Sequence, residues 1–332
     1  MPSIDRDLTP LHVVAGLIWD GTRVFITRRH AAAHQGDLWE FPGGKLGAGE
    51  EPQQGLAREL HEELGITVRS AEPYAKVHYV YPERAVLLDV WRVTAYDGVA
   101  HGREGQAACW RDVTALRPSD FPLADRPIVR RLQLPRLYAI SNAAAVGLDA
   151  FTISLERALD AGLRLVQLRE PALDVDAYCA YARKLAALCH RYGAKLLINA
   201  DPALLAACEA DGVQLSARRL ASLAARPIEA NLLLGASCHN RAELALAQAI
   251  EVDFALLSPV EPTPSHPHAI ALGWDAFQQL CATTHLPVYA LGGLATSDVG
   301  RARQAGAIGV AAIRGVWEAD DIVAAIKTTL AD

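Results

Sequence analysis

Gly44-Lys45-Leu46-Gly47-Ala48-Gly49-Glu50 is followed, after a gap of seven residues, by Arg58-Glu59-Leu60-His61-Glu62-Glu63-Leu64-Gly65-Ile66. Pro52 suits the first turn of a helix, because its fixed backbone angle is helical and its missing N–H is not needed there. Gly65 suits the stop at the C-terminal end. The stretch therefore predicts a glycine-rich loop leading into a helix that begins near Pro52 and ends before Gly65.

Three glutamates of this helix lie on one face. Successive helical residues are about 100° apart, so Glu59 and Glu63 are neighbours and Glu62 lies close beside them. Their charges would repel one another unless cations neutralise them. Carboxylate oxygens at this density suit Mg2+, with Mn2+ as the alternative, and these ions bridge the phosphate oxygens of a diphosphate. A merely solvated acidic face is the competing interpretation.

The loop before the helix completes this arrangement. Gly43 and Gly44 let the main chain approach the glutamates, so that a carbonyl oxygen can join the ligands of the metal. We expect Glu50 to pair with Arg58 and so to fix the loop against the helix. The motif predicts a site for a divalent metal and a diphosphate.

Length and composition limit the classes of protein. The 332 residues are comfortable for two domains, and 51% hydrophobic residues can fill their cores. A net charge of −6 argues against direct nucleic-acid binding. The six cysteines are scattered without a Cys-x-x-Cys pair, as in reduced proteins. With no signal-like or transmembrane run, we expect a cytoplasmic chain without a membrane partner.

The first third of the chain alternates strand and turn signals around the predicted helix. His12–Trp19 and Arg23–Arg29 are candidate strands of a hairpin, with a tight turn at Asp20-Gly21. Ala85–Ala95 is a further long apolar run. A mixed sheet with a catalytic helix predicts an α/β/α sandwich.

After Pro135 the pattern changes to short apolar runs separated by helical stretches such as Ala177–His190 and Arg241–Ile250. The runs are Leu137–Ile140, Leu163–Leu168, Lys195–Asn199, Gly212–Leu215, Leu232–Ser237, Phe254–Val260, Val288–Gly293 and Gly309–Ile313. Eight strands that alternate with helices predict an α/β chain ending in a (β/α)8 TIM barrel. We expect domains at residues 8–133 and 136–330.

The opening motif has the spacing of the Nudix box, and further segments extend the similarity over residues 10–132. They are Phe25-Ile26-Thr27-Arg28-Arg29, Ala33-His34, Trp39-Glu40-Phe41-Pro42-Gly43-Gly44-Lys45, Tyr81-Pro82-Glu83-Arg84, Glu104-Gly105-Gln106 and Asp120-Phe121-Pro122. This part resembles the MutT branch of the Nudix hydrolases, the oxidised-purine nucleotide pyrophosphohydrolases. The resemblance implies cleavage of a nucleoside triphosphate to the monophosphate and pyrophosphate, and hence nucleotide-pool sanitation.

The resemblance also implies roles for single residues. The metal would be held by Glu59, Glu62, Glu63 and the carbonyl of Gly44, and Arg58 belongs to the same catalytic group. Glu104 would be a ligand or act in proton transfer. The expected substrate contacts are Arg29 and Lys45 on the phosphates, Phe41 and Arg84 beside the base, and His34 near the nucleotide. Arg29 as a solvated strand residue and Phe41 as plain core packing remain alternatives.

Asp125 departs from the family pattern, which has an asparagine that reads the oxidised guanine edge. An amide can donate to O6 and accept from the N7 hydrogen of the 8-oxo form, whereas an ionised carboxylate can only accept. It would repel O6 unless it is protonated, or it must turn to N1–H and N2–H of the base. A desolvated aspartate with a raised pKa would restore the donor. We expect 8-oxo-dGTP to be cleaved with higher efficiency than dGTP.

Residues 136–330 carry a second set of family motifs. They are Val166-Gln167-Leu168-Arg169-Glu170, Leu197-Ile198-Asn199, Ala210-Asp211-Gly212-Val213-Gln214-Leu215, Gly235-Ala236-Ser237-Cys238-His239-Asn240, Ser258-Pro259-Val260-Glu261-Pro262-Thr263-Pro264 and Ala290-Leu291-Gly292-Gly293. This part resembles thiamine phosphate synthases and the related TenI proteins. The synthases need cations and Mg2+ ligands for a leaving pyrophosphate.

Several of the positions that the resemblance assigns to pyrophosphate are changed. The family's lysine, its two metal-binding aspartates, its Thr-Lys pair and a serine appear as Pro171, Ala200, Arg219, Ser265-His266 and Arg314. The TenI histidine is replaced by Pro259. We therefore expect no synthase reaction. The retained candidates for binding a phosphorylated small molecule are Gln167, Arg169, Asn199, Ser237, Thr263 and Gly293, each of which can equally maintain the fold.

Three functional hypotheses follow. The first is a MutT-type pyrophosphohydrolase fused to a barrel without synthase activity. The second directs the Nudix site at a thiamine-pathway diphosphate. In the third the barrel is a ligand-sensing or oligomerising module. Oligomeric state is not predicted.

Overall fold

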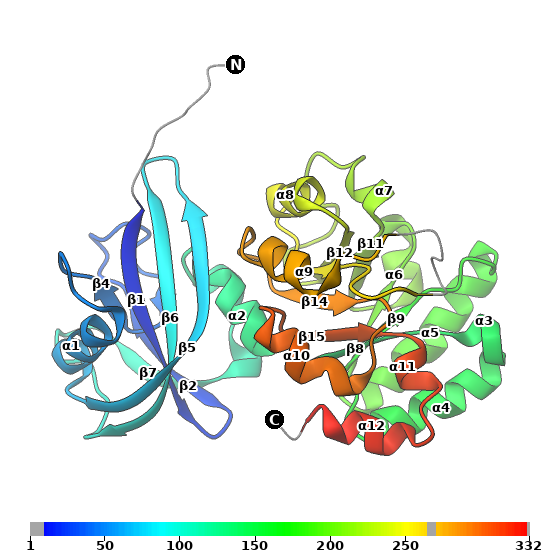
Figure 1. Ribbon diagram of the computed structural model, residues 1–332, viewed down its shortest axis with the longest axis horizontal. Coiled ribbons are helices and arrows are strands. Elements are labelled where there is room, and N and C mark those ends of the chain that lie inside the picture. The colour runs from blue at the N-terminus through cyan, green and yellow to red at the C-terminus, as the bar shows by residue number, and fades with distance from the viewer. Residues whose placement is uncertain (1–9, 264–269, 331–332) are drawn as a thin grey trace. The chain divides into compact units, whose positions relative to one another are not determined.

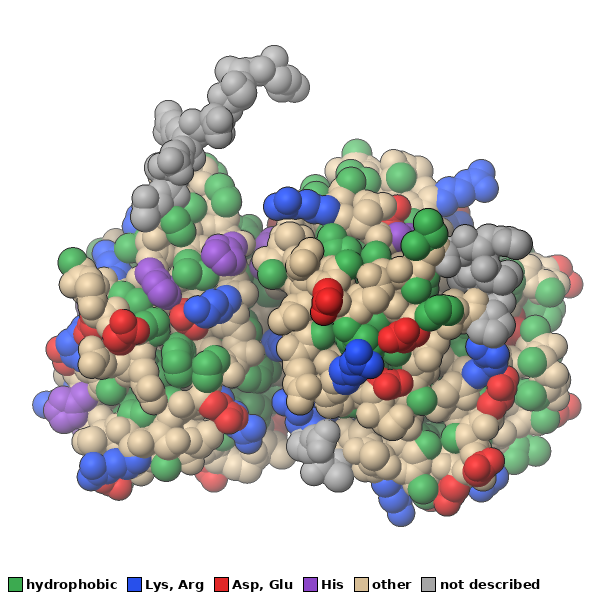
Figure 2. Space-filling model, in the orientation of Figure 1, with side chains coloured by type: hydrophobic (Ala, Val, Ile, Leu, Met, Phe, Trp, Pro, Cys, Tyr) green, Lys and Arg blue, Asp and Glu red, His purple; other side chains and the backbone are tan. Residues whose placement is uncertain are grey.

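The computed structural model describes residues 10–263 and 270–330 (Figure 1). Contacts within the chain divide it into two compact units, Met1–Gln133 and Leu134–Asp332. Acidic and basic side chains are interspersed over the face of each unit that Figure 2 shows. None of the helices in the two described ranges is long and apolar enough to cross a membrane.

The first unit is built on one mixed sheet. Its strands are β1 (Leu11–Asp20), β2 (Arg23–Arg28), β3 (Trp39–Glu40), β4 (Gly43–Lys45), β5 (Thr67–Val80), β6 (Ala85–Asp97) and β7 (Ala108–Asp112). Its helical elements are α1 (Pro52–Leu64), η1 (Val113–Ala115), η2 (Pro118–Asp120) and α2 (Arg126–Gln133). The strand order is β3-β2-β1-β6-β5, with β4 also on β1 and β7 on β2. β1 is parallel to β6 and antiparallel to β2 and β4.

The two helices cover opposite faces of this sheet. Val14 and Ile18 of β1 pack in one core cluster with Leu60 of α1. Leu17 points to the other face and packs in a second cluster with Val129 of α2. Alternation along a strand produces this division, because successive side chains point to opposite faces. The predicted α/β/α sandwich is confirmed.

No strand is predicted from the sequence at β5, which is one of the two longest strands of the sheet. β5 pairs antiparallel with β6 along its length, but the register shifts at Val68/Ser70, Ser70/Ala71 and Pro73/Ala75. Each shift interrupts the alternation of inward and outward side chains. The burial of the strand is therefore irregular, and no period of two is visible in its sequence.

The second unit is a closed barrel of parallel strands. The strands are β8 (Leu137–Ile140), β9 (Leu165–Leu168), β10 (Lys195–Ile198), β11 (Gly212–Leu215), β12 (Leu233–Cys238), β13 (Phe254–Leu257), β14 (Val288–Leu291) and β15 (Gly309–Ala312). Between and after them come α3 (Ala143–Val146), α4 (Leu148–Asp160), α5 (Val175–Arg191), η3 (Pro202–Leu204), α6 (Leu205–Cys208), α7 (Ala217–Leu220), α8 (Arg241–Ala249), α9 (Gly273–Cys281), η4 (Thr296–Asp298), α10 (Val299–Gln304), α11 (Arg314–Trp317) and α12 (Ile322–Thr328).

All eight predicted barrel strands are present, and the predicted TIM barrel is confirmed. β9 begins two residues later than expected, because the N–H of Leu163 still bonds the preceding helix at the carbonyl of Ala158. The rings of Tyr138, Phe254 and Tyr289 lie 5.5 to 5.7 Å apart inside the barrel. They fill its interior, so a ligand must bind at the ends of the strands.

Candidate functional site

The helix α1 is placed by its ends and by one apolar stripe. Pro52 occupies its first turn, and Gly65 ends it in the left-handed conformation at φ 71°. Both predicted ends are confirmed. The stripe that anchors α1 on the sheet consists of buried leucines four residues apart, namely Leu56, Leu60 and Leu64. The opposite side of the helix is left for its charged residues.

Arg58 connects the glycine-rich loop to the helix. Its Nε donates to Oε1 of Glu50 and its Nη2 to Oε2, both at 2.9 Å, which confirms the predicted pair. Its Nη1 donates to Glu59 at 2.8 Å and to Glu62 at 3.2 Å. The bonds from Arg58, followed by one from the N–H of Gly47, lower the pKa of Glu50 to about 2. The loop is thereby fixed by an ionised carboxylate.

Glu63 lies at the centre of a group of carboxylates. Its Oε2 accepts a hydrogen bond of 3.1 Å from the N–H of Gly43. Burial, followed by the charge of Glu40, raises the pKa of Glu63 to about 8, and the charges of Glu59 and Glu104 act in the same direction. Glu104, which comes from the loop before β7, therefore belongs to this group.

The donor set fits a divalent cation. Glu59 and Glu63 lie on α1 beside β4, and Gly44 leaves room for them, since a Cβ there would lie 2.3 Å from Cδ of Glu59. Arg58 shares its single positive charge among Glu50, Glu59 and Glu62, and residues 10–263 and 270–330 contain no group of three His, Cys, Asp or Glu side chains arranged to hold a metal. A hard cation would nevertheless relieve the repulsion that adds to burial in raising the pKa of Glu63.

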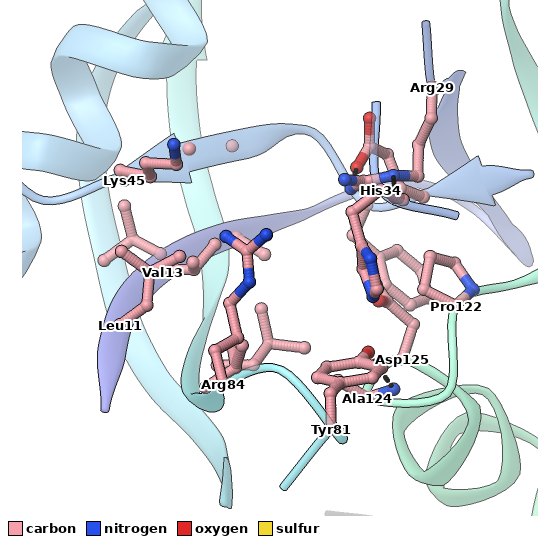
Figure 3. A pocket seen from close by; sticks show the side chains of 18 residues that line it. Leu11, Val13, Arg29, His34, Lys45, Tyr81, Arg84, Pro122, Ala124 and Asp125 are labelled. Atoms are coloured by element: carbon pink, nitrogen blue, oxygen red, sulfur yellow. Dashed lines mark hydrogen bonds and ion pairs between the residues drawn. The ribbon is translucent and has the colours of Figure 1, made fainter. Parts of the chain in front are cut away.

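A cavity of about 270 Å³ opens beside these carboxylates. Its lining contains all six residues that are expected to contact the nucleotide, namely Arg29, His34, Phe41, Lys45, Arg84 and Asp125. Leu11 and Val13 of β1 lie along one side, and Tyr81, Ala124 and Asp125 along another (Figure 3). Gly43 and Gly44 also line the cavity, so it is continuous with the carboxylate group.

Asp125 is the buried carboxyl of this cavity, with 7% of its surface exposed. Burial is the main cause that raises its pKa to about 7, and the charge of Glu40 adds to it. Arg29 and a hydrogen bond from the N–H of Phe41 oppose the shift. Near neutral pH a large share of Asp125 is therefore protonated, and the carboxyl can both donate and accept.

Phe41 belongs both to the core and to the cavity. Its ring stacks on that of Phe121 at 5.5 Å, and only 2% of its surface is exposed. It also lines the cavity. The ring of His34 meets Tyr81 edge-on at 5.0 Å, and the hydroxyl of Tyr81 accepts from the N–H of Ala124. Tyr81 thereby braces the turn that leads to α2.

Arg29 pairs with Glu40, a partner that the sequence analysis did not assign. Nη1 of Arg29 bonds Oε2 of Glu40, and both side chains are largely buried. Glu40 and Tyr81 are thus two cavity residues without an expected role. Glu40 lies in a segment that carries the family resemblance, where a carboxylate between Trp39 and Phe41 is a further sequence signal.

In the barrel, the structure brings part of the second candidate set together. Asn199, the residue after β10, donates from Nδ2 to Oε1 of Gln167 on β9 at 3.2 Å. Ser237 accepts from Gln214, also at 3.2 Å. Gly293, at φ 69°, packs on the segment just before Thr263, where a Cβ would lie 2.7 Å from a carbonyl oxygen. Arg169 is exposed, and Ser265-His266 lies outside the described residues.

Comparisons with known proteins agree with this division. The NUDIX domain family matches residues 14–131, and the thiamine monophosphate synthase family matches residues 137–316, more than half of the chain. An 8-oxo-dGTP diphosphatase of Escherichia coli (strain K12) is 40% identical over 124 residues, which are 37% of this chain and 96% of that protein. A putative thiamine-phosphate synthase 2 of Aquifex aeolicus (strain VF5) is 35% identical over 182 residues, 55% of this chain and 97% of that protein.

Among solved structures, a thiamine phosphate pyrophosphorylase from Pyrococcus furiosus superposes with a TM-score of 0.50 at 23% identity, covering 59% of this chain and 93% of that one. This likeness supports the barrel fold. The first unit, with its complete glutamate motif, is an enzyme that acts on phosphoanhydride bonds. The chain therefore belongs to the Nudix hydrolases through its N-terminal domain and to the thiamine monophosphate synthase family through its C-terminal domain.

Proposed function

We propose that the N-terminal domain hydrolyses 8-oxo-dGTP to 8-oxo-dGMP and pyrophosphate with the help of Mg2+, and so removes an oxidised precursor before DNA replication can use it. The observation that carries this proposal is the buried carboxyl of Asp125 in the lining of the cavity, where burial raises its pKa. The name of the Escherichia coli relative, an 8-oxo-dGTP diphosphatase, supports the same substrate.

Asp125 can distinguish oxidised from normal guanine. A protonated carboxyl donates its hydrogen to O6 of the base and accepts the N7 hydrogen that only the 8-oxo form carries. In dGTP the N7 lone pair faces the carboxyl oxygen, so a buried acceptor is left without a donor. Sites that lose a hydrogen bond in this way reject the wrong substrate strongly. We propose that Phe41 and Arg84 flank the ring and that His34 lies beside the nucleotide.

The phosphates would extend from this cavity towards α1. We propose that Glu59, Glu62, Glu63 and the carbonyl of Gly44 hold the metal, which would polarise the phosphate oxygens and neutralise their charge. Glu104, as ligand or proton acceptor, and Lys45, as a cation beside the phosphates, complete the site. Arg58 positions Glu59 and Glu62. Arg29, paired with Glu40, orients the base end and contacts the phosphates only if that ion pair opens.

A pyrophosphate-release assay tests the substrate. We expect a kcat/KM for 8-oxo-dGTP at least about a hundredfold above that for dGTP, the range expected when a buried polar group loses its partner. Asp125→Leu, which has neither donor nor acceptor, is expected to reduce that ratio. Equal efficiencies on the two nucleotides would overturn the assignment.

A second candidate is motivated by the fusion itself. Because the partner domain belongs to the thiamine monophosphate synthase family, the Nudix site could act on a diphosphate of thiamine metabolism. A substrate panel that contains 8-oxo-dGTP and thiamine intermediates separates the two proposals. Faster turnover of the thiamine intermediates would favour the second.

For the barrel we propose that synthase activity has been lost, with functional domains at residues 8–133 and 136–330. Pro171, Ala200 and Arg219 replace groups that the reaction needs, whereas Gln167 and Asn199 remain in contact. Condensation of a pyrimidine diphosphate with a thiazole phosphate by the full chain would contradict this. A sensing role predicts that thiazole phosphate raises the melting temperature of the chain. An oligomerising role predicts a change of mass in solution when the barrel surface is altered.

We also propose a cytoplasmic location. The six cysteines are all free of disulfide bonds, which fits a reducing compartment. A blot of fractionated cells tests this proposal.

A further inference from the structure

A row of polar groups follows the strands β9, β10 and β11, which are neighbours in the barrel. Gln167 on β9 accepts from Asn199, the residue after β10. The next residue, Ala200, accepts a hydrogen bond of 2.7 Å at its carbonyl from Nη1 of Arg219 on α7. The guanidinium of Arg219 is therefore held at the carboxyl end of the strands, where TIM barrels bind their ligands.

An amide beside this row has unused hydrogen-bonding atoms. Both side-chain polar atoms of Asn142, after β8, are buried and bond to no described residue. Nε2 of Gln167 is buried too, but the phenol of Tyr138 accepts from Gln167 and donates its own hydrogen to Gln214 at 3.4 Å, so Asn142 is the amide with both polar atoms unused. Buried polar atoms without partners are rare in folded proteins and point to a bound water or ligand.

Asn142 does not cap the helix that follows it, because Glu170 takes that role. Asn142 stands at the start of α3, where an asparagine usually caps the helix. Here the carboxylate of Glu170 bonds the N–H groups of Ala143 and Ala144, both at 2.9 Å. The amide of Asn142 is thereby released from helix capping and available to a ligand.

The same place does not fit a divalent metal. The resemblance to the synthases calls for aspartates where this chain has Ala200 and Arg219. The remaining acid is Asp201, which lies 3.6 Å from Nη2 of Arg219 and also caps η3 through the N–H of Ala203. A dication would have to displace the guanidinium from Asp201, and the carboxylate of Glu170 is already bonded to Ser141, Ala143 and Ala144. The fixed positive charge of Arg219 stands where the resemblance calls for a metal-binding aspartate.

We propose that the barrel binds a phosphate or diphosphate group without a divalent metal, with the guanidinium of Arg219 supplying the positive charge. Guanidinium groups bind phosphate oxygens through two parallel hydrogen bonds and need no ion in between. Arg169, exposed two residues after Gln167, adds a second cation at the same end. Asn142 then bonds the polar part of the ligand. This site is independent of the function proposed for the Nudix domain.

Isothermal titration of the full-length chain with inorganic pyrophosphate in EDTA tests the proposal. EDTA leaves the Nudix domain without metal. Arg219→Gln removes the charge but keeps a donor for the carbonyl of Ala200, so that the loop stays in place. The matched control is Arg218→Ala, which removes one charge from the exposed neighbour on the same helix.

Binding is expected in EDTA with the same Kd for the wild type and Arg218→Ala, and with a Kd at least about tenfold weaker for Arg219→Gln, the loss typical of one charged hydrogen bond. The ratio of the Kd of Arg219→Gln to the Kd of Arg218→Ala should stay the same when Mg2+ is added. The proposal is overturned if pyrophosphate does not bind in EDTA, if Mg2+ is required for the Arg219-sensitive binding, or if both variants bind equally well.

Discussion

Gly44 of β4 and Glu59 of α1 approach each other so closely that a Cβ on Gly44 would lie 2.3 Å from both Cδ and Oε2 of the glutamate. The backbone of Gly44 is not in the left-handed region, so conformation does not demand glycine here. Glycine is required because a side chain would occupy the space of the Glu59 carboxylate. A strand and a helix that are separate in sequence thus meet at a contact that only a residue without a side chain permits.

Gly44→Ala is expected to lower kcat at least about a hundredfold, roughly 3 kcal/mol of transition-state stabilisation, because the methyl group displaces Glu59 from the position in which we propose that it binds the metal. Gly300→Ala is the control, since nothing lies within 4 Å of a Cβ there. Steady-state pyrophosphate release measures both. Full activity of Gly44→Ala would show that Glu59 is not needed in its present place.

The affinity for 8-oxo-dGTP should depend on the ionisation of Asp125. Its pKa is raised to about 7, so the carboxyl loses its donor hydrogen as the pH rises through that value. We expect KM to increase about tenfold between pH 6 and pH 8.5, the range of one lost hydrogen bond with a buried partner. Asp125→Asn keeps a donor at every pH, and its KM should change much less. Parallel profiles for the two proteins would count against the role of Asp125.

The same shift predicts a pH dependence of stability. The folded pKa of Asp125 lies above its ordinary value of 3.8, so the folded state binds the proton more tightly. This contribution is complete below about pH 3.8 and is lost as the pH rises through about 7. The free energy of opening the first unit, from amide hydrogen exchange, should fall between pH 4 and pH 7 relative to Asp125→Asn. A constant difference between the two would contradict the raised pKa.

Removal of divalent metal should abolish hydrolysis. EDTA is expected to stop pyrophosphate release, and Mg2+ should restore it. Glu63→Gln should require a Mg2+ concentration at least about tenfold higher, because a neutral amide is a poorer ligand for a hard cation. Glu72→Gln is the matched control, since Glu72 is exposed on β5 and pairs with Arg92. An unchanged Mg2+ requirement in Glu63→Gln would exclude Glu63 as a ligand.

Arg58→Ala should affect catalysis more than stability. The side chain is 37% exposed, so its ion pairs contribute about 1 kcal/mol or less to folding. It nevertheless orients Glu50, Glu59 and Glu62, and we expect kcat to fall more than about tenfold. Arg69→Ala, which breaks the exposed pair with Asp97, should leave kcat unchanged. Equal effects of the two substitutions on kcat would show that the ion pairs of Arg58 have no special role in catalysis.

Much of the fold could be predicted because its signals are local. Proline at the start and glycine at the end of α1, and short apolar runs for the barrel strands, depend on backbone geometry that each segment carries by itself. β5 could not be predicted in this way. Its bulges are set by pairing with β6, so its own residues show no regular alternation.

In the candidate site, too, contacts between residues close in sequence could be predicted, whereas contacts between separate elements could not. The helical period alone placed Glu59 and Glu63 together, and the charge pattern alone paired Glu50 with Arg58. The ion pair between Arg29 and Glu40 was missed because the two residues meet only when β2 and β3 are side by side.

The sequence by itself determined the metal-binding motif, the two families and the barrel, because residue types at fixed spacing are sufficient for these. Only the tertiary structure decided that burial raises the pKa of Asp125 to about 7 and that Arg219 is held at the carbonyl of Ala200. The physical reason is desolvation and contact. The pKa of a carboxyl and the partner of a guanidinium depend on what surrounds them in space, which residues distant in the chain supply.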